Sequence, residues 1–567
     1  MKRFQQPQAV LQQALTLYQQ QQYQAALPLL QQLSQQLPEQ ALVWHVQALT
    51  LRKLGQLTAA AQSFTQALKI APKHHEILNN YGNLLRQQQR YEQAQQQFRL
   101  ALQAQPNFFE ARYNLGLTAL AQQQLDDALA AFLTVLKQQP QHTQARLAAA
   151  EAYRLQGRAQ QALELLQQSF HAQSVAFLRQ RALAFFALDE VDLAYADMRA
   201  ALALQPRQLA LHETFSDMRW LQQDSDWLGS YYEQLAAHND WHDLRLGLTH
   251  RLIKAEQFEL AEQTLQPLLQ LDSVPASVWL LQGHLKRMQG QLARAEDYLQ
   301  RALSLQPEQQ EALYEMFVTQ LGQQNYVECL QLSQKLVTLA PGHQGWWAMR
   351  ATALKASGDW QGYQRLYDFG RFVRPFALTT AADGGLSDFN QGLLAKLERL
   401  HTQKQHPLQQ SLRSGTQTDG QLFLNQDEDI QALKQQISAA VTQYIAELPD
   451  DPEHPFLKRK SGRFKYTGAW SVRLNCSGFH RNHYHSEGWI SGCFYVSIPK
   501  AVNHDGHGWI KFGQAQLDPT YMDEPDYIVK PQAGVVVLFP SMMWHGTVPF
   551  ADDEYRVTVA FDLVPEE

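Results

Sequence analysis

The chain has 567 residues, too many for one hydrophobic core, and 45% of them are hydrophobic, which is ordinary for a globular protein. The net charge of −6 excludes a basic field that would recruit nucleic acid or an anionic membrane surface. Three widely separated cysteines exclude a disulfide framework, and no apolar run approaches the length of a membrane span.

The first twenty residues, "MKRFQQPQAVLQQALTLYQQ", begin with two basic residues but contain no continuous apolar stretch. They predict an amphipathic helix and not a secretory signal. We therefore expect the protein in the cytoplasm.

Several residue types then recur in one register of 34 residues. The register is kept by prolines, phenylalanines and alanines: Pro38, Pro72, Pro106 and Pro140; Phe64, Phe98 and Phe132; Ala60, Ala94, Ala128 and Ala162. A small residue lets two helices approach, an aromatic ring fills the groove between them, and a proline ends the second helix. The pattern resembles the tetratricopeptide repeat, a helical hairpin with a period of 34 residues.

The array continues less regularly to about residue 377, with units ending at Pro307 and Pro341 and an irregular stretch at 207–270. We expect about ten hairpins over residues 1–377. The resemblance implies an α-solenoid that binds a protein or peptide; a scaffold for dimerisation is the alternative.

After this array the sequence changes character. Residues 378–425 read as a linker and lead-in, and residues 426–447 show the apolar spacing of one more amphipathic helix. Short β-rich runs follow: "WSVRLN", "ISGCFYVSIP", "HGWIKFG", "YIVKP", "GVVVLFP" and "RVTVAFDLV". They predict an all-β jelly roll with flanking helices over residues 426–567.

Three histidines stand beside these strands. His483 and His485 precede one strand and share a face if the segment is extended, and His545 follows the apolar strand 535–539. A jelly roll can bring His545 opposite the pair. Arg556 and Thr558 share a face of the last strand, and an arginine inside a barrel needs an anion, for which a carboxylate is suited.

The order H-x-H, S-G-x-x-Y, G-x-x-x-L-F-P-S, W-H-G-T-x-P-F and R-x-T-x-x-F-D resembles the Fe(II)/2-oxoglutarate-dependent oxygenases of bacteria and phages, from about residue 385 onward. The resemblance implies a double-stranded β-helix with His545 as the distal iron ligand. It also implies that Arg556 and Thr558 hold the 2-oxoglutarate C5 carboxylate. Tyr495, on the strand after the first histidines, could hydrogen-bond the same cosubstrate.

The first ligands depart from the superfamily pattern, in which the residue two after the first histidine is Asp or Glu. Here His483 takes the first position and His485 the second. Three ligand sets remain open: His483, His485 and His545 together; His483 and His545 with water; or a shifted register in which His485 and Glu487 bind. His480, three residues before His483, is expected on the opposite side of a strand, as a surface or hydrogen-bonding residue.

The expected function is iron-dependent hydroxylation coupled to 2-oxoglutarate decarboxylation, on a protein or peptide presented by the repeats. Aspartyl and prolyl hydroxylases also join such repeats to this kind of domain. One rival is a three-histidine dioxygenase or cupin-like enzyme that uses no 2-oxoglutarate. Another is a repeat adaptor with an inactive oxygenase domain. The substrate and oligomeric state are not predicted.

Overall fold

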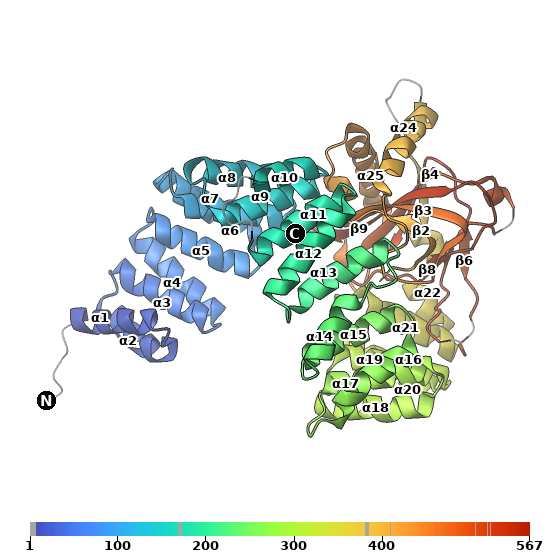
Figure 1. Ribbon diagram of the computed structural model, residues 1–567, viewed down its shortest axis with the longest axis horizontal. Coiled ribbons are helices and arrows are strands. Elements are labelled where there is room, and N and C mark those ends of the chain that lie inside the picture. The colour runs from blue at the N-terminus through green and yellow to red at the C-terminus, as the bar shows by residue number, and fades with distance from the viewer. Residues whose placement is uncertain are drawn as a thin grey trace. The chain divides into compact units, whose positions relative to one another are not determined.

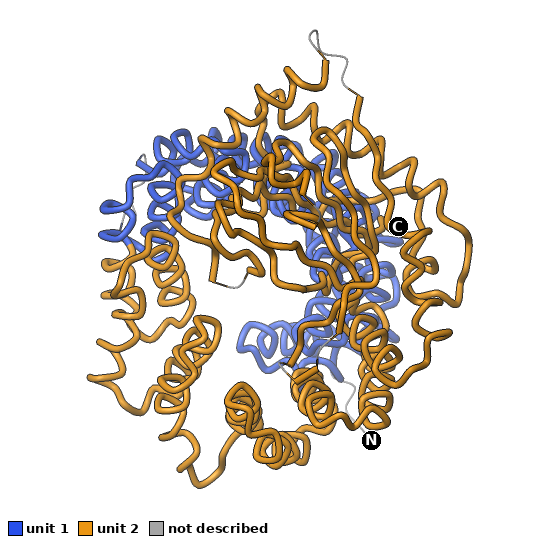
Figure 2. The backbone as a smooth tube through the Cα atoms, turned by 90° about the vertical axis from the view of Figure 1, so that its right-hand side faces the viewer, with its two compact units in different colours: residues 1–197 blue, residues 198–567 orange. Residues whose placement is uncertain are grey.

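A computed structural model describes residues 7–167, 173–379, 385–408, 410–504, 506–518, 520–521 and 523–566. The chain packs as two compact units, residues 1–197 and 198–567 (Figure 2). Within the described residues, no helix combines the length and apolarity needed to cross a membrane.

In the part of the array that the structure describes, helices α1 to α22 follow one another as antiparallel hairpins, eleven against the ten or so expected (Figure 1). The first twelve are α1 (Pro7–Gln19), α2 (Tyr23–Gln36), α3 (Ala41–Lys53), α4 (Leu57–Ile70), α5 (His75–Gln87), α6 (Tyr91–Ala104), α7 (Phe109–Ala121), α8 (Leu125–Gln138), α9 (Thr143–Leu155), α10 (Ala159–Gln167), α11 (Val175–Ala187) and α12 (Val191–Leu204). The remaining ten are α13 (Leu209–Leu221), α14 (Gly229–Ala237), α15 (His242–Lys254), α16 (Phe258–Leu265), α17 (Ala276–Met288), α18 (Leu292–Leu305), α19 (Gln310–Gly322), α20 (Tyr326–Leu339), α21 (Gln344–Ser357) and α22 (Trp360–Leu366).

The recurring small and aromatic residues pack as the repeat pattern predicts. A Cβ atom added to Gly82 would lie 2.6 Å from the ring of Phe98, and one on Gly116 would lie 2.6 Å from that of Phe132. Both rings are fully buried. Glycine at these points lets the first helix of a hairpin touch the aromatic side chain of the second.

The repeat prolines end hairpins, and a side chain six residues later often caps the turn by donating to the proline carbonyl. These bonds are Trp44 to Pro38 (2.9 Å), Arg112 to Pro106 (3.0 Å), Arg146 to Pro140 (2.6 Å) and Trp347 to Pro341 (2.9 Å). They satisfy carbonyls that have no helical partner.

The irregular stretch 207–270 has shortened second helices. Helices α14 and α16 have 9 and 8 residues, whereas α4, α6 and α8 each have 14. A 3₁₀ turn, η1 (Gln266–Gln270), follows α16.

The C-terminal domain is a jelly roll of two sheets with flanking helices. The helices are α23 (Phe369–Phe372), α24 (Gly385–Leu400) and α25 (Glu428–Glu447), with 3₁₀ turns η2 (Leu422–Leu424), η3 (Leu457–Arg459) and η4 (Lys500–Asn503). The strands are β1 (Arg374–Ala377), β2 (Leu412–Gln417), β3 (Phe464–His480), β4 (Ile490–Ser497), β5 (Ile510–Phe512), β6 (Tyr527–Val529), β7 (Val535–Pro540), β8 (His545–Thr547) and β9 (Arg556–Pro565). The larger sheet has the order β1-β7-β4-β9-β3-β2, and the smaller one β6-β5-β8.

The strands expected from the sequence are present as β3, β4, β5, β6, β7 and β9, and the expected helix is α25. The sheet, however, begins earlier than the expected boundary at residue 377, because β1 pairs antiparallel with β7. Strand β2 and helix α24 lie within the expected lead-in, residues 378–425, of which residues 380–384 and 409 are outside the described part. Both β1 and β2 are edge strands, too short or too polar to show an alternating pattern.

The last repeats and the jelly roll share one hydrophobic core. It runs without interruption from Leu299 on α18 to Leu563 on β9. Polar contacts reinforce it: the Trp544 indole donates to Thr352 Oγ1 on α21 at 2.9 Å, and the backbone N–H of Gln344 donates to Ser486 O at 2.8 Å. The solenoid end is therefore part of the domain that it adjoins.

A glycine pair on either side of the α21 N-terminus tests this contact. A Cβ on Gly345 would overlap the ring of Tyr484, whereas one on Gly342 would meet nothing within 4 Å. We expect Gly345→Ala to lower the free energy of unfolding of the second unit by about 1–3 kcal/mol through overpacking, and Gly342→Ala to leave it nearly unchanged. Chemical denaturation of the two variants measures the difference; equal stabilities would show that Tyr484 does not depend on α21.

Candidate metal and carboxylate site

Two distant chain segments meet in a short antiparallel bridge. The backbone N–H of His483 donates to the carbonyl of His545 at 2.8 Å, and the reverse bond measures 2.9 Å. The N–H of His485 donates to the carbonyl of Ser541 at 3.0 Å. The segment after β3 is thus tied at two points to the segment that joins β7 to β8, which brings three imidazoles together.

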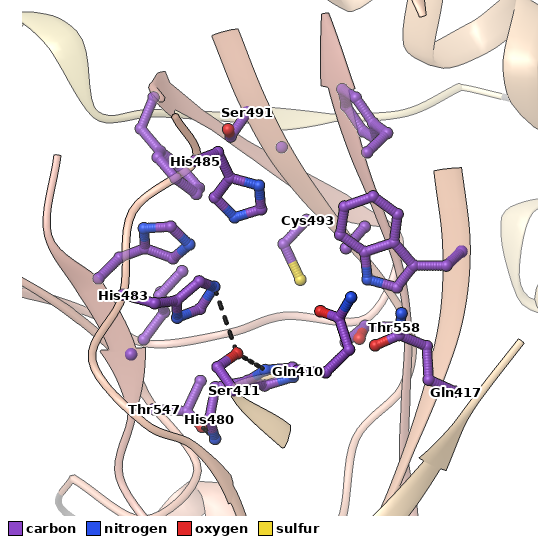
Figure 3. Close-up of a pocket in the computed structure, with 18 of the residues that line it drawn as sticks. Gln410, Ser411, Gln417, His480, His483, His485, Ser491, Cys493, Thr547 and Thr558 are labelled. Carbon is purple, nitrogen blue, oxygen red and sulfur yellow. Dashed lines mark hydrogen bonds between the residues drawn. The ribbon is translucent and has the colours of Figure 1, made fainter. Parts of the chain in front are cut away.

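The three rings converge on one space. Their centroids are 4.2 Å apart for His483 and His545, and 5.1 Å apart for each of the other two pairs. One nitrogen from each ring can be chosen such that all three nitrogens lie within 4.8 Å of one another. Figure 3 shows His483 and His485 facing the pocket together with the Cys493 thiol. Three imidazoles at this separation suit a transition metal such as iron.

Each ring is oriented by a hydrogen bond at Nδ1. The acceptors are Arg481 O for His483 (2.8 Å), Met543 O for His545 (2.9 Å) and a carboxylate oxygen, Asp562 Oδ2, for His485 (2.5 Å). When Nδ1 carries the proton that is donated, Nε2 keeps its lone pair for another partner. This is the arrangement by which proteins fix the tautomer of a metal-binding histidine.

Burial keeps two of these histidines, His483 and His545, uncharged. It lowers the pKa of His483 to about 3, helped by the neighbouring His485, and it lowers the pKa of His545 well below its ordinary value. Neutral imidazole is the form that binds metals. At neutral pH both rings are therefore ready to act as ligands.

The same pocket contains a buried guanidinium. Arg556 is 1% exposed, and its Nη1 donates to Gly508 O at 2.8 Å. Among the described residues no carboxylate forms an ion pair with it, and its Nε makes no hydrogen bond. An unpaired buried charge is costly, so the space beside Arg556 suits an anion.

Thr558 and Tyr495 face the same space as Arg556. The two residues are directly opposite each other in the β4–β9 pairing, and Thr558 is two residues after Arg556 on β9. The buried Tyr495 hydroxyl makes no hydrogen bond of normal geometry to the described residues, although the Cys493 thiol lies beside it. Two hydroxyls and a guanidinium thus converge on one end of the pocket.

The cavity between the histidines and Arg556 has a volume of about 60 Å³, which is room for roughly four waters or a small organic anion. Other polar and aromatic side chains also line it, namely Gln410, Ser411, Gln417, Trp470 and Thr547.

Glu487 and His480 both lie outside the group of three converging histidines. Glu487 is exposed and is not among the three residues with converging nitrogens; its charge acts on His343 and Arg459. His480 lines the pocket, and its Nδ1 lies 3.0 Å from Ser411 Oγ. Its expected position on the opposite side was wrong, because β3 ends at His480 and the chain turns before His483, so strand alternation does not extend between them.

Sequence reasoning did not find Ser411, Gln417 and Asp562. The first two come from the region around β2, which shows no alternating strand pattern. Asp562 continues the alternation of Arg556 and Thr558 along β9, but its pairing with Ser491 of β4 depends on the sheet register, which local sequence does not specify.

Comparison with known families agrees with this geometry. Residues 468–562 match the family described as "Putative 2OG-Fe(II) oxygenase". The tetratricopeptide repeat family matches at residues 11–75, 45–109, 79–141, 113–173 and 246–315. No curated protein matches the chain in sequence.

Solved repeat proteins resemble parts of the chain. Pseudomonas aeruginosa PilF is 23% identical over 37% of this chain and 96% of its own, with a TM-score of 0.32. The type IV pilus biogenesis factor PilW is 26% identical over 37% and 97%, with a TM-score of 0.34. YrrB, described as a protein with an unusual peptide-binding site, is 17% identical over 33% and 96%, with a TM-score of 0.29. Such low scores support no further conclusion.

The repeat matches cover most of the first unit and part of the second, and the oxygenase match spans β3 to β9, where the three histidines and Arg556 lie. The chain contains tetratricopeptide repeats and, toward its C-terminus, a domain that matches the family described as "Putative 2OG-Fe(II) oxygenase".

Proposed function

We propose that this protein is an Fe(II)/2-oxoglutarate-dependent oxygenase that hydroxylates a protein or peptide substrate. The observation that carries the proposal is a buried, unpaired guanidinium in the same small cavity as three converging imidazoles. A dianionic cosubstrate bound between a metal on the imidazoles and Arg556 would explain both the histidine group and the buried guanidinium.

In this proposal His483, His485 and His545 hold iron through Nε2, since Nδ1 of each ring is already engaged. Three protein ligands leave positions for 2-oxoglutarate and O2. When bound, the iron supplies the oxidation that inserts oxygen into a substrate C–H bond while 2-oxoglutarate becomes succinate and carbon dioxide.

Arg556 binds the C5 carboxylate of 2-oxoglutarate, and Thr558 and Tyr495 hydrogen-bond the same end. The free Nε of Arg556 and the unpartnered Tyr495 hydroxyl support this assignment, because a bound carboxylate would satisfy both. The apolar walls formed by Ile510, Phe539 and Phe561 keep water away from the reacting centre.

The repeats are the part of the chain that presents the substrate. Glu256, in the turn between α15 and α16, forms ion pairs with Arg413 and Arg481, which are close in sequence to the pocket residues Ser411 and His483. A partner held by the repeats of the second unit would then lie close to the mouth of the pocket.

Anaerobic titration of Fe(II) and 2-oxoglutarate tests the proposal. A weak visible charge-transfer band should appear when both are present. Arg556→Ala should abolish the band while iron stays bound, because only the cosubstrate loses its partner. His545→Ala should lose both iron and band. Arg463→Ala, at an exposed arginine of the same domain, is the matched control and should behave as wild type.

The rival functions give different results in the same titration. Retained iron with no response to 2-oxoglutarate in the wild-type protein indicates a three-histidine enzyme of the cupin-like kind. An absence of iron binding indicates an adaptor with an inactive domain. Either result contradicts the proposal.

A second pair of variants decides the ligand set. We expect His485→Ala to weaken Fe(II) binding by a factor of at least about 10 and Glu487→Ala to change it by less than about twofold, because Glu487 is exposed and lies outside the converging group. Equilibrium competition with a coloured chelator measures both affinities. The opposite order would assign the third ligand to Glu487.

A further inference from the structure

One carboxylate touches the three-histidine group without belonging to it. Asp562 Oδ2 accepts from His485 Nδ1 at 2.5 Å, and Asp562 Oδ1 accepts from Ser491 Oγ at 2.6 Å. The Ser491 hydroxyl also lies 2.8 Å from Ser541 Oγ, and the Ser541 carbonyl receives the backbone N–H of His485. These bonds hold both ends of His485, its backbone and its ring.

The sheet register fixes the position of this carboxylate. Asp562 lies opposite Ser491 in the β4–β9 pairing, and Ser491 itself lines the pocket. Its side chain is 15% exposed and that of His485 is 17% exposed. Asp562 is therefore set in an inner strand of the sheet, and both side chains of the pair are largely shielded from solvent.

Asp562 is not itself placed to bind the metal. Its carboxylate is not among the groups whose ligand atoms lie within 4.8 Å of one another, and it bonds the ring nitrogen that is not needed for coordination. Nor does it form an ion pair with any lysine or arginine in the described ranges. Its interaction with His485 is thus not explained by a structural salt bridge to a permanently charged residue.

The other two rings lack such a partner. His483 and His545 donate to backbone carbonyls, so among the described residues Asp562 is the one carboxylate that accepts a hydrogen bond from the group. His485 is also the residue at the position where the superfamily pattern has an acidic ligand. In this chain the negative charge is on Asp562, which is hydrogen-bonded to His485 and does not contact the metal position directly.

We infer that Asp562 is a positioning residue for the metal site. It holds His485 in the tautomer with the proton on Nδ1 and directs Nε2 toward the metal. It also places a negative charge beside this imidazole, which partly replaces the missing carboxylate ligand. The inference depends on the proposed iron site. It adds that the three histidines which bind the metal are supported by one aspartate that does not bind it.

Anaerobic titration with Co(II), a spectroscopic substitute for Fe(II), tests the inference. In Asp562→Asn the amide can offer a donor where His485 needs an acceptor, and in Asp562→Ala the acceptor is lost. Both variants should raise the Co(II) dissociation constant about 10- to 100-fold and shift the visible ligand-field bands. Asp562→Glu, which keeps the carboxylate, should recover part of the affinity.

Two controls separate positioning from stability. Asp553→Asn removes one exposed charge from the same domain and should bind Co(II) as wild type does. Ser491→Ala removes one hydrogen bond to Asp562 but leaves the bond between Asp562 and His485. Its Co(II) dissociation constant should therefore rise less than that of Asp562→Asn. This order should hold whatever Ser491→Ala does to the melting temperature of the metal-free protein.

The outcomes distinguish this inference from the proposed function. If the wild-type protein binds neither Co(II) nor Fe(II), the proposed function itself fails. Suppose instead that the wild-type protein binds Co(II). If Asp562→Asn and Asp562→Ala then bind Co(II) as tightly as the wild-type protein, with unchanged spectra, Asp562 has no positioning role. An Asp562→Glu variant that binds no tighter than Asp562→Asn, or a His485→Ala variant with wild-type affinity, also overturns the inference.

Discussion

The candidate site depends on a single backbone bridge between His483 and His545. Its two hydrogen bonds join segments that are about sixty residues apart in the chain, and together with the bond from His485 to Ser541 they bring the imidazoles together. The bridge lies where the end of β3 approaches β8, so it links the larger sheet to the smaller one. The fold thus brings two of the candidate ligands together by main-chain pairing and not by side-chain packing alone.

Residues of the last repeats pack against the aromatic side chains next to this bridge. Tyr484, between the two proximal histidines, packs edge-on against Trp544, which precedes the distal one, with ring centroids 4.9 Å apart. The Trp544 indole is anchored to Thr352 of α21, and the Tyr484 ring fills the space that Gly345 leaves open. Because one hydrophobic core continues from α18 to β9, the C-terminal domain is not an independent unit attached to a solenoid. The repeats of the second unit are part of what keeps the histidines in place.

The sequence predicted the features that leave a periodic or spaced pattern. The 34-residue register identified the hairpins because each repeat needs its small and aromatic residues at the same points. The His-x-His pair, His545 and Arg556 were found because histidines and an arginine beside apolar strands are unusual. Edge strands β1 and β2 were missed because they have few residues and little apolar alternation.

The remaining misses have a different physical cause. His480 was placed on the opposite side because strand alternation was extended across a turn. Asp562 was not considered because its role lies in a contact with His485, 77 residues away, and such a pairing depends on sheet register that local sequence does not specify. The spacing of residues in the sequence predicts which side chains are candidate ligands. It predicts the hydrogen-bond partners of those side chains only when the strand pairing is known.

The account as a whole requires three imidazoles on one iron. X-ray absorption at the iron edge of the anaerobic Fe(II) protein measures this directly, since imidazole rings give a distinctive scattering pattern. Three imidazoles in the wild-type protein, and one fewer in any iron that His545→Ala retains, are the predicted result. A wild-type spectrum fitted by two imidazoles and a carboxylate, or by oxygen ligands alone, would contradict it.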